Sequence, residues 1–227
     1  PYGEKTTKEV IDLSKKGCDF LMEKGVKAIV VACNTASALA MEEAQKKFNI
    51  PIIGVIEPGA KAAISCTKNN TIGIIGTEGT INSNAYQRYI RKQLPSAEII
   101  GVACPLFVQI VEEGWENSDV AYLTAQKYLL ELKEHNVDTL VLGCTHYPAM
   151  RYTISKVMGE KVQLVNPAYE TAKLTKNILK EQGLLNEKLD GGICKFYVTD
   201  DPEKFKRVGG NLIRRQIESV EKIDLTE

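Results

Sequence analysis

The chain has 227 residues, of which 44% are hydrophobic and 26% are charged, enough apolar material for one large domain or two smaller lobes. Its 29 basic residues balance its 29 acidic ones, so no overall field draws the chain to nucleic acid or to an anionic lipid surface. Its apolar runs, such as residues 28–33, are much shorter than the about 20 residues that a membrane-spanning helix needs. We therefore expect neither a nucleic-acid nor a membrane partner.

Strand-like apolar segments alternate with segments of helical periodicity along the whole chain. Thr6 and Glu9 have the spacing of a capping box, and apolar residues then recur at helical spacing as far as Gly25, which predicts a first helix. Short apolar runs predict strands at residues 27–32, 51–56, 71–76, 98–103, 139–144, 162–166 and 195–199. Helical patterns cover approximately residues 35–48, 80–94, 106–114, 119–135, 149–158, 168–182 and 202–214. The weakly alternating tail, residues 217–225, is compatible with an edge strand.

This alternation predicts an α/β fold. Continuously apolar strands separated by helices are typical of mainly parallel sheets that helices cover on both faces. Functional sites in such sheets lie at the C-terminal ends of the strands. If the chain forms two lobes, we expect crossings near residues 57–58 and 166–167, which gives a first lobe of residues 1–56 plus 167–227 and a second lobe of residues 57–166.

Six cysteines accompany only two histidines, and no two cysteines have the C-x-x-C spacing of a zinc ribbon or a redox dithiol. A chain of this size can bury a core without disulfides. We therefore expect free thiols in a reducing cytoplasm and no metal site. Cys18, Cys66 and Cys194 lie inside helical or strand patterns, and Cys104 precedes Pro105 at a strand end, so all four are more typical of packing residues.

Two cysteines stand at equivalent places in a weak internal repeat. Residues 29–35 read IVVACNT and residues 140–146 read LVLGCTH, so that in each an apolar strand leads to a cysteine and then to small polar residues. A cysteine at such a strand end lies near the positive end of the following helix, where backbone N–H groups favour the thiolate. Cys33 and Cys144 are therefore candidates for chemistry, although so short a repeat also arises by chance among parallel strands.

Two thiols on opposite faces of a substrate suit the inversion of a carbon stereocentre. One group removes the proton from one face and the other delivers a proton to the opposite face, so one starts as thiolate and the other as thiol. His146 is the only histidine beside a candidate thiol and suits a hydrogen-bonding partner, whereas His135, in a polar helix end, is expected on the surface. A thiol redox sensor remains an alternative, since folding can bring distant cysteines together.

Several segments occur in an order that carries a resemblance: PYG at the start, then ACNTASA (32–38), GTEGTINSNAY (76–86), CPLFVQIVEEG (104–114) and GCTHYP (143–148). Together they resemble the signatures of the glutamate racemase family, in the aspartate/glutamate racemase superfamily. The resemblance implies two pseudo-symmetric α/β lobes with the active site between them. It also implies a cofactor-independent isomerase that interconverts L- and D-glutamate in the cytoplasm, supplies peptidoglycan synthesis and thereby cell-wall formation and cell shape, and is commonly a homodimer.

The resemblance also implies roles for individual residues. Cys33 and Cys144 match the two catalytic cysteines, with Cys33 acting on the D-isomer and Cys144 on the L-isomer. Glu112 and His146 match residues that assist proton transfer at Cys144, although Glu112 alone would also fit a solvated helix face. The matched substrate-binding positions are Tyr2, Gly3, Asn34, Thr35, Thr77 and Thr145.

One part of the family pattern has no match here. The family's chain begins with a strand and a glycine-rich turn whose aspartate assists the first cysteine, and no counterpart is found ahead of Pro1. We therefore expect Cys33 to lack that partner and this chain to fall short of full activity. Two further readings stay open: a racemase of the same superfamily with another substrate such as aspartate, and an inactive fragment or binding protein that keeps the fold. The sequence His-Tyr-Pro at 146–148 favours glutamate.

Overall fold

The computed structural model describes residues 2–187 and 192–225, and Pro1 of the opening segment lies outside this part. The strands are β1 (Ile29–Val31), β2 (Ile52–Gly54), β3 (Thr71–Gly76), β4 (Glu98–Ala103), β5 (Thr139–Gly143), β6 (Gln163–Val165), β7 (Tyr197–Val198) and β8 (Glu221–Lys222). They form a four-stranded sheet in the order β4-β3-β5-β6 and two pairs, β1-β2 and β7-β8. The pairings within these sheets are parallel, so the predicted α/β fold is confirmed.

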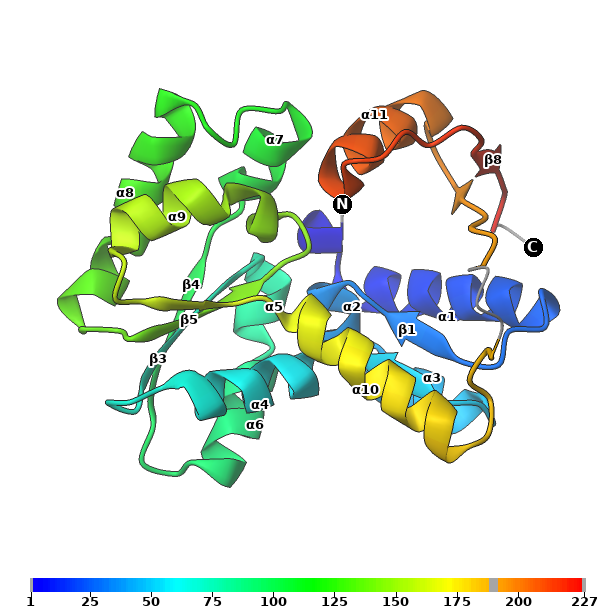
Figure 1. Cartoon of the computed structure of the whole chain (residues 1–227), viewed down its shortest axis with the longest axis horizontal. Helices are drawn as coiled ribbons and strands as arrows, with labels where there is room; N and C mark the ends of the chain where they lie inside the picture. Colours follow the sequence, from blue (N-terminus) through cyan, green and yellow to red (C-terminus); the bar gives the residue numbers. More distant parts are fainter. Residues whose placement is uncertain (1, 188–191, 226–227) are drawn as a thin grey trace.

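Helices surround these sheets in two lobes (Figure 1). The α-helices are α1 (Thr7–Glu23), α2 (Asn34–Leu39), α3 (Met41–Lys47), α4 (Ile56–Cys66), α5 (Glu78–Asn82), α6 (Ala85–Gln93), α7 (Leu106–Glu112), α8 (Asp119–Glu134), α9 (Arg151–Met158), α10 (Pro167–Glu181) and α11 (Pro202–Ile213). Two 3₁₀ helices are η1 (Tyr2–Glu4) and η2 (Tyr147–Met150). Within the described residues, no helix is long and apolar enough to cross a bilayer.

The four-stranded sheet is buried on both faces. Leu140 and Leu142 of β5 pack into a cluster with α7, α8 and α9, whereas Val141 between them packs with α4 and α6 on the other face. Because successive side chains of a strand point to opposite faces, covering both faces requires an unbroken apolar run. This is why β3 and β5 could be located from the sequence.

The lobe that contains β1 and β2 has a smaller core. Cys18 of α1, Ile29 of β1, Ala44 of α3 and Ile52 of β2 form its buried cluster. The predicted capping box at the start of α1 is confirmed: the backbone N–H and the hydroxyl of Thr6 donate to the Glu9 carboxylate, while the Glu9 N–H donates to the Thr6 hydroxyl. The box satisfies donors that the first helical turn leaves without backbone partners.

Two helical predictions need correction, and one helix was not predicted. The helix predicted at residues 35–48 is two helices, α2 and α3, that meet at Ala40, and the helix predicted at 80–94 is α5 and α6, separated at Asn84 in a left-handed conformation (φ 53°). Asparagine tolerates this conformation better than most residues. α4 was not among the expected elements. Its Pro58 lies in the first turn, where a missing N–H breaks no helical hydrogen bond.

The residues predicted for the crossings between lobes lie at helix starts. Glu57 and Pro58 fall in the first turn of α4, and Asn166 caps α10, whose first residue is Pro167. α4 packs against α10 and against β5. The division into residues 1–56 plus 167–227 and residues 57–166 stays a prediction. Cys194, predicted as a packing residue, is exposed, because the chain around it lies outside regular structure.

Candidate active site

Three strands end around a cavity of about 190 Å³. Cys33 follows β1 and caps α2, Thr77 follows β3 and caps α5, and Cys144 follows β5 directly. This edge is where parallel sheets place their sites. Of the ten predicted site residues, all except Glu112 line this cavity: Tyr2, Gly3, Cys33, Asn34, Thr35, Thr77, Cys144, Thr145 and His146.

Two glycines allow the backbones around the cavity to approach closely. A Cβ on Gly143 would lie 2.6 Å from the backbone oxygen of Ile75, so only glycine fits where β5 passes β3 immediately before Cys144. A Cβ on Gly3 would lie 3.1 Å from Cγ2 of Thr77, so the backbone of η1 lies close against the end of β3. These contacts fix the position of Cys144 and bring Tyr2 and Gly3 over the cavity.

A cluster of three buried hydroxyls joins α2 to α5. Oγ1 of Thr35 lies 2.8 Å from Oγ1 of Thr77 and 3.3 Å from Oγ1 of Thr80, and the latter two hydroxyls are 3.2 Å apart. Thr77 also accepts a hydrogen bond from the Thr80 backbone N–H as the N-cap of α5. Each hydroxyl has one proton and two lone pairs, so the cluster can turn donors toward an anion in the cavity.

A buried tyrosine fixes the orientation of Asn34. The hydroxyl of Tyr86, whose side chain is 1% exposed, lies 2.7 Å from Oδ1 of Asn34 and donates to it. With its oxygen engaged, the amide presents its NH₂ group as the free donor. Asn34 lines the cavity, so this NH₂ can bind an oxygen of a ligand.

A line of polar groups leads from Cys144 to the surface. Sγ of Cys144 lies 3.8 Å from Nδ1 of His146, Nε2 of His146 lies 3.4 Å from Oε1 of Glu112, and Oε2 of Glu112 lies 2.5 Å from Nζ of Lys204. The Glu112 carboxylate favours the tautomer with the proton on Nε2. Nδ1 then faces Cys144 as an acceptor, so His146 can take the proton of the thiol.

Burial dominates the acid–base properties of this line. Burial raises the pKa of the Cys144 thiol to about 12. The backbone N–H of His146 acts against this rise, and negative charge at Cys33 adds to it. Burial also lowers the pKa of the His146 ring, which Glu112 partly offsets. For Glu112, burial would raise the pKa, but the hydrogen bond and charge of Lys204, together with His146, outweigh it and leave the pKa below its ordinary value. Glu112 is therefore ionised, as is Lys204 beside it.

The two cavity cysteines have different surroundings. Cys33 is half-buried at the start of α2, whereas Cys144 is 8% exposed, and neither forms a disulfide. Burial, and then the charge of Cys33, raise the pKa of the Tyr2 hydroxyl, so Tyr2 lies within electrostatic reach of that thiol. Because each thiolate disfavours the other, a state with both cysteines ionised is unfavourable.

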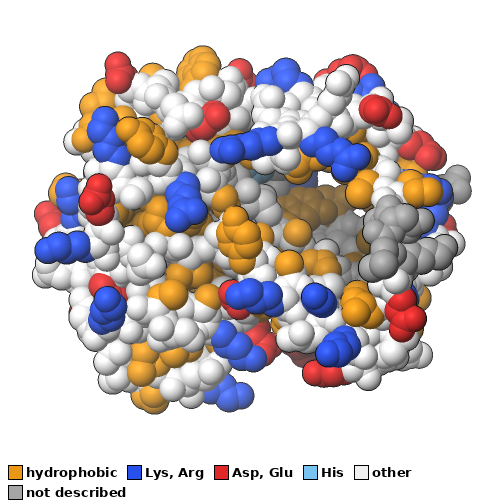
Figure 2. All heavy atoms as spheres, in the orientation of Figure 1, with side chains coloured by type: hydrophobic (Ala, Val, Ile, Leu, Met, Phe, Trp, Pro, Cys, Tyr) orange, Lys and Arg blue, Asp and Glu red, His pale blue; other side chains and the backbone are white. Residues whose placement is uncertain are grey.

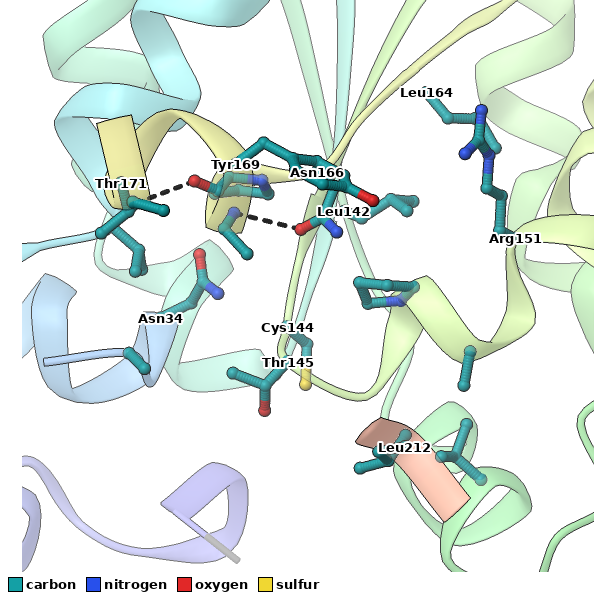
Figure 3. Close-up of a pocket in the computed structure, with 18 of the residues that line it drawn as sticks. Asn34, Leu142, Cys144, Thr145, Arg151, Leu164, Asn166, Tyr169, Thr171 and Leu212 are labelled. Atoms are coloured by element: carbon teal, nitrogen blue, oxygen red, sulfur yellow. Dashed lines mark hydrogen bonds between the residues drawn. The ribbon is translucent and has the colours of Figure 1, made fainter. Parts of the chain in front are cut away.

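A larger hollow of about 1590 Å³ lies beside the small cavity. Figure 2 shows the molecule hollowed on this face, and Figure 3 shows Asn34, Cys144 and Thr145 in the wall of the hollow, near Leu142 and Asn166. The first three of these residues also line the small cavity. Cys144 therefore borders both spaces.

Three residues of this arrangement were not singled out from the sequence. Thr80 and Tyr86 lie in the segment 76–86 that carries part of the resemblance, so that segment was the available signal. Lys204 lies in a helix far along the chain and had no local signal. His135, predicted on the surface, is exposed and pairs with Glu98 at 2.9 Å, and Cys104, predicted to pack, is fully buried.

Comparison with known proteins gives a consistent result. Residues 3–175 match the family model of Asp/Glu/hydantoin racemases. A glutamate racemase of Geobacter metallireducens is 45% identical over 225 residues, which cover 99% of this chain and 83% of that protein. A crystal structure of a glutamate racemase from Bacillus anthracis has a TM-score of 0.94 at 38% identity, covering 99% of this chain and 84% of that one.

A further crystal structure has a ligand bound. It is a glutamate racemase from Francisella tularensis in complex with D-glutamate, with a TM-score of 0.92 at 36% identity, covering 100% of this chain and 84% of that one. Family model, sequence identity and fold therefore agree over nearly the whole chain. The chain belongs to the Asp/Glu/hydantoin racemase family and, within it, to the glutamate racemases.

Proposed function

We propose that the protein interconverts L- and D-glutamate by proton transfer between the substrate and two cysteines, Cys33 and Cys144. The observation that supports this most directly is that both free thiols line one small cavity with a set of hydroxyl and amide donors. The cavity, at about 190 Å³, is below the roughly 300–1,000 Å³ of pockets that enclose drug-sized ligands, and so suits an amino acid.

The donors around the cavity match the charges of glutamate. The Asn34 NH₂ and the hydroxyls of Thr35, Thr77 and Thr145 bind carboxylate oxygens, and η1 with Tyr2 and Gly3 closes over the substrate. The α-ammonium group brings a positive charge beside the thiols and favours the thiolate form. Binding therefore supplies part of the stabilisation that the buried Cys144 thiolate lacks.

The reaction from L- to D-glutamate begins at Cys144. Without help, the buried thiolate at about pH 7 costs roughly 7 kcal/mol, since each pKa unit corresponds to about 1.36 kcal/mol and the pKa is about 12. His146 reduces this cost by accepting the thiol proton at Nδ1, and Glu112 stabilises the imidazolium that results. The Cys144 thiolate then removes the α-proton of L-glutamate.

Cys33 completes the inversion from the opposite face. Its thiol gives a proton to the planar carbanion, so that the cycle ends with Cys33 as thiolate and Cys144 as thiol, and the reverse reaction exchanges these roles. One proton leaves carbon and one returns, and no electrons are gained or lost. The chemistry therefore needs no cofactor. The product, D-glutamate, serves peptidoglycan synthesis.

We further propose that the protein acts in the cytoplasm as a homodimer. Val120, Leu123 and Leu130 are exposed on one face of α8, and pairing of two copies would cover them. Sedimentation equilibrium over a range of concentrations tests the dimer, and a monomer at all concentrations refutes it.

The function is tested by incubating each glutamate enantiomer with the protein in deuterated water. We expect loss of circular dichroism together with deuterium at the α-carbon, and less exchange with either enantiomer of aspartate. Cys33→Ala and Cys144→Ala should each abolish racemisation, while Cys194→Ala, at an exposed thiol, serves as the matched control. Absence of α-deuteration at high protein concentration would refute the proposal, and a fully active single variant would refute the role of that cysteine.

A further inference from the structure

α11 brings a charged residue to the side of Glu112 that faces away from His146. Nζ of Lys204 lies 2.5 Å from Oε2 of Glu112, while Oε1 of the same carboxylate lies 3.4 Å from Nε2 of His146. The Glu112 side chain is 14% exposed and the Lys204 side chain is 50% exposed, so the carboxylate is the more buried partner of this ion pair. Glu112 is thus held between two positively charged or protonatable partners.

The contact between α11 and Glu112 has a second component. Nη1 of Arg207, one turn after Lys204, donates to the backbone carbonyl of Glu112 at 3.2 Å. No side chain of α11 is fully buried, and on its other side Phe205 packs on Phe196 with ring centroids 6.0 Å apart. α11 therefore reaches Glu112 through two polar contacts, one to its carboxylate and one to its backbone carbonyl.

We propose that Lys204 is a positioning residue that keeps His146 able to accept the proton of Cys144, by neutralising part of the charge of Glu112. The proposal rests on the proposed function, because it concerns the proton path to Cys144. An unopposed Glu112 carboxylate holds a proton on His146, and a protonated His146 has no free lone pair for the thiol. Lys204 weakens that hold and also repels the imidazolium directly.

The charges around the pair support this assignment. Glu112 draws the pKa of His146 upward, while Lys204 acts on it in the opposite direction. Other charged groups act on this pair as well: the positive charge of the chain's amino terminus also lowers the pKa of His146, and Glu113 at the end of α7 and Arg207 on α11 act on Lys204 itself. Of these groups, Lys204 is the one that shares a carboxylate with His146.

Lys204→Met should therefore raise the pKa of His146 and move the acid limb of kcat/KM to higher pH. On that limb we expect a loss of about fivefold, the upper end of what an ion pair with a solvent-exposed partner contributes. The loss should fall on kcat and not on KM, because Lys204 does not line the cavity. Lys204→Arg should restore the profile. Lys206→Met, which removes a lysine paired with Glu203 on the same helix, is the matched control.

A titration of the histidine ring protons by NMR tests the inference without catalysis. The chain has two histidines, and a His135→Gln background leaves His146 as the single signal to follow. We expect its midpoint to rise in Lys204→Met and to return in Lys204→Arg, with far-ultraviolet circular dichroism unchanged. A midpoint that stays or falls, or a kinetic profile that superimposes on the parent's, overturns the inference. Absence of racemisation in the parent protein refutes the proposed function instead, and the titration still decides the role of Lys204.

Discussion

Tyr86→Phe removes a single oxygen from the interior and tests how the Asn34 amide, which we propose binds the substrate, is oriented. The Tyr86 hydroxyl donates to Oδ1 of Asn34 at 2.7 Å, and both side chains are buried. Phenylalanine keeps the ring and its packing in the core around α4 and α6. The variant therefore isolates one hydrogen bond.

The loss of this bond has two consequences of different kinds. A buried acceptor left without a partner costs about 1–3 kcal/mol, which for a chain of this size lowers Tm by about 2–4 °C per kcal/mol. The freed amide can also rotate and turn Oδ1 toward a substrate carboxylate, replacing a donor with a repulsive acceptor. If about 1 kcal/mol of the loss appears in binding, KM rises about fivefold.

Tyr147→Phe is the matched control. Its hydroxyl is equally buried and donates to the backbone carbonyl of Cys104 at 2.8 Å, but it does not contact Asn34 or line the cavity. Both variants should melt at lower temperature in differential scanning calorimetry, and only Tyr86→Phe should raise KM for both glutamate enantiomers. Equal KM values in the two variants, with Tm lowered in each, would refute the reasoning about amide orientation.

Two further predictions concern stability. Gly143→Ala should lower the free energy of unfolding by about 1–3 kcal/mol, since its Cβ would meet the Ile75 backbone oxygen at 2.6 Å; thermal unfolding checks this, and an unchanged Tm contradicts it. The pKa of Glu112 is lower in the folded protein than in the unfolded chain, so ionised Glu112 stabilises the fold at pH values above the ordinary pKa of glutamate. This stabilisation is lost as the pH falls through the lowered pKa of the folded state. Urea unfolding at pH values from about 7 to about 3 measures the free energy of unfolding of the parent and of Glu112→Gln, and we expect the difference between the two to shrink in acid. A difference that stays constant with pH contradicts this linkage.

The fold was predictable where one local signal dominates. β3 and β5 are apolar runs because both of their faces are buried, and the capping box at Thr6 marks α1 by itself. Periodicity could not show the break at Ala40, because Ala36, Ala40 and Ala44 are all buried and keep the helical repeat across it. α4 escaped notice because a proline looks like a break unless its place in the first turn is known.

The candidate site was also predictable only where a local sequence signal marks its residues. The repeat around Cys33 and Cys144 indicated both strand ends, and the resemblance supplied the polar residues that follow them. Lys204 could not be found, because an ion pair between α11 and α7 joins distant parts of the chain and leaves no spacing to read. Contacts of this kind depend on how the two lobes meet, which no segment of either lobe specifies alone.

The internal repeat suggests two equivalent thiols, yet their surroundings differ. Cys144 is buried beside His146 and Glu112, whereas Cys33 is half-buried at the start of a helix. The two enantiomers have equal free energy in water, so the equilibrium constant is one and kcat/KM must be the same in both directions, however unlike the thiols are. The asymmetry can appear only in quantities that this equality leaves free: KM and kcat for each enantiomer separately, and the solvent and primary isotope effects on each. Forming the buried Cys144 thiolate has the larger desolvation cost, so substitutions at His146 and Glu112 should slow proton removal from L-glutamate. In those variants the primary isotope effect with α-deuterated L-glutamate should therefore increase more than the effect with the α-deuterated D-isomer.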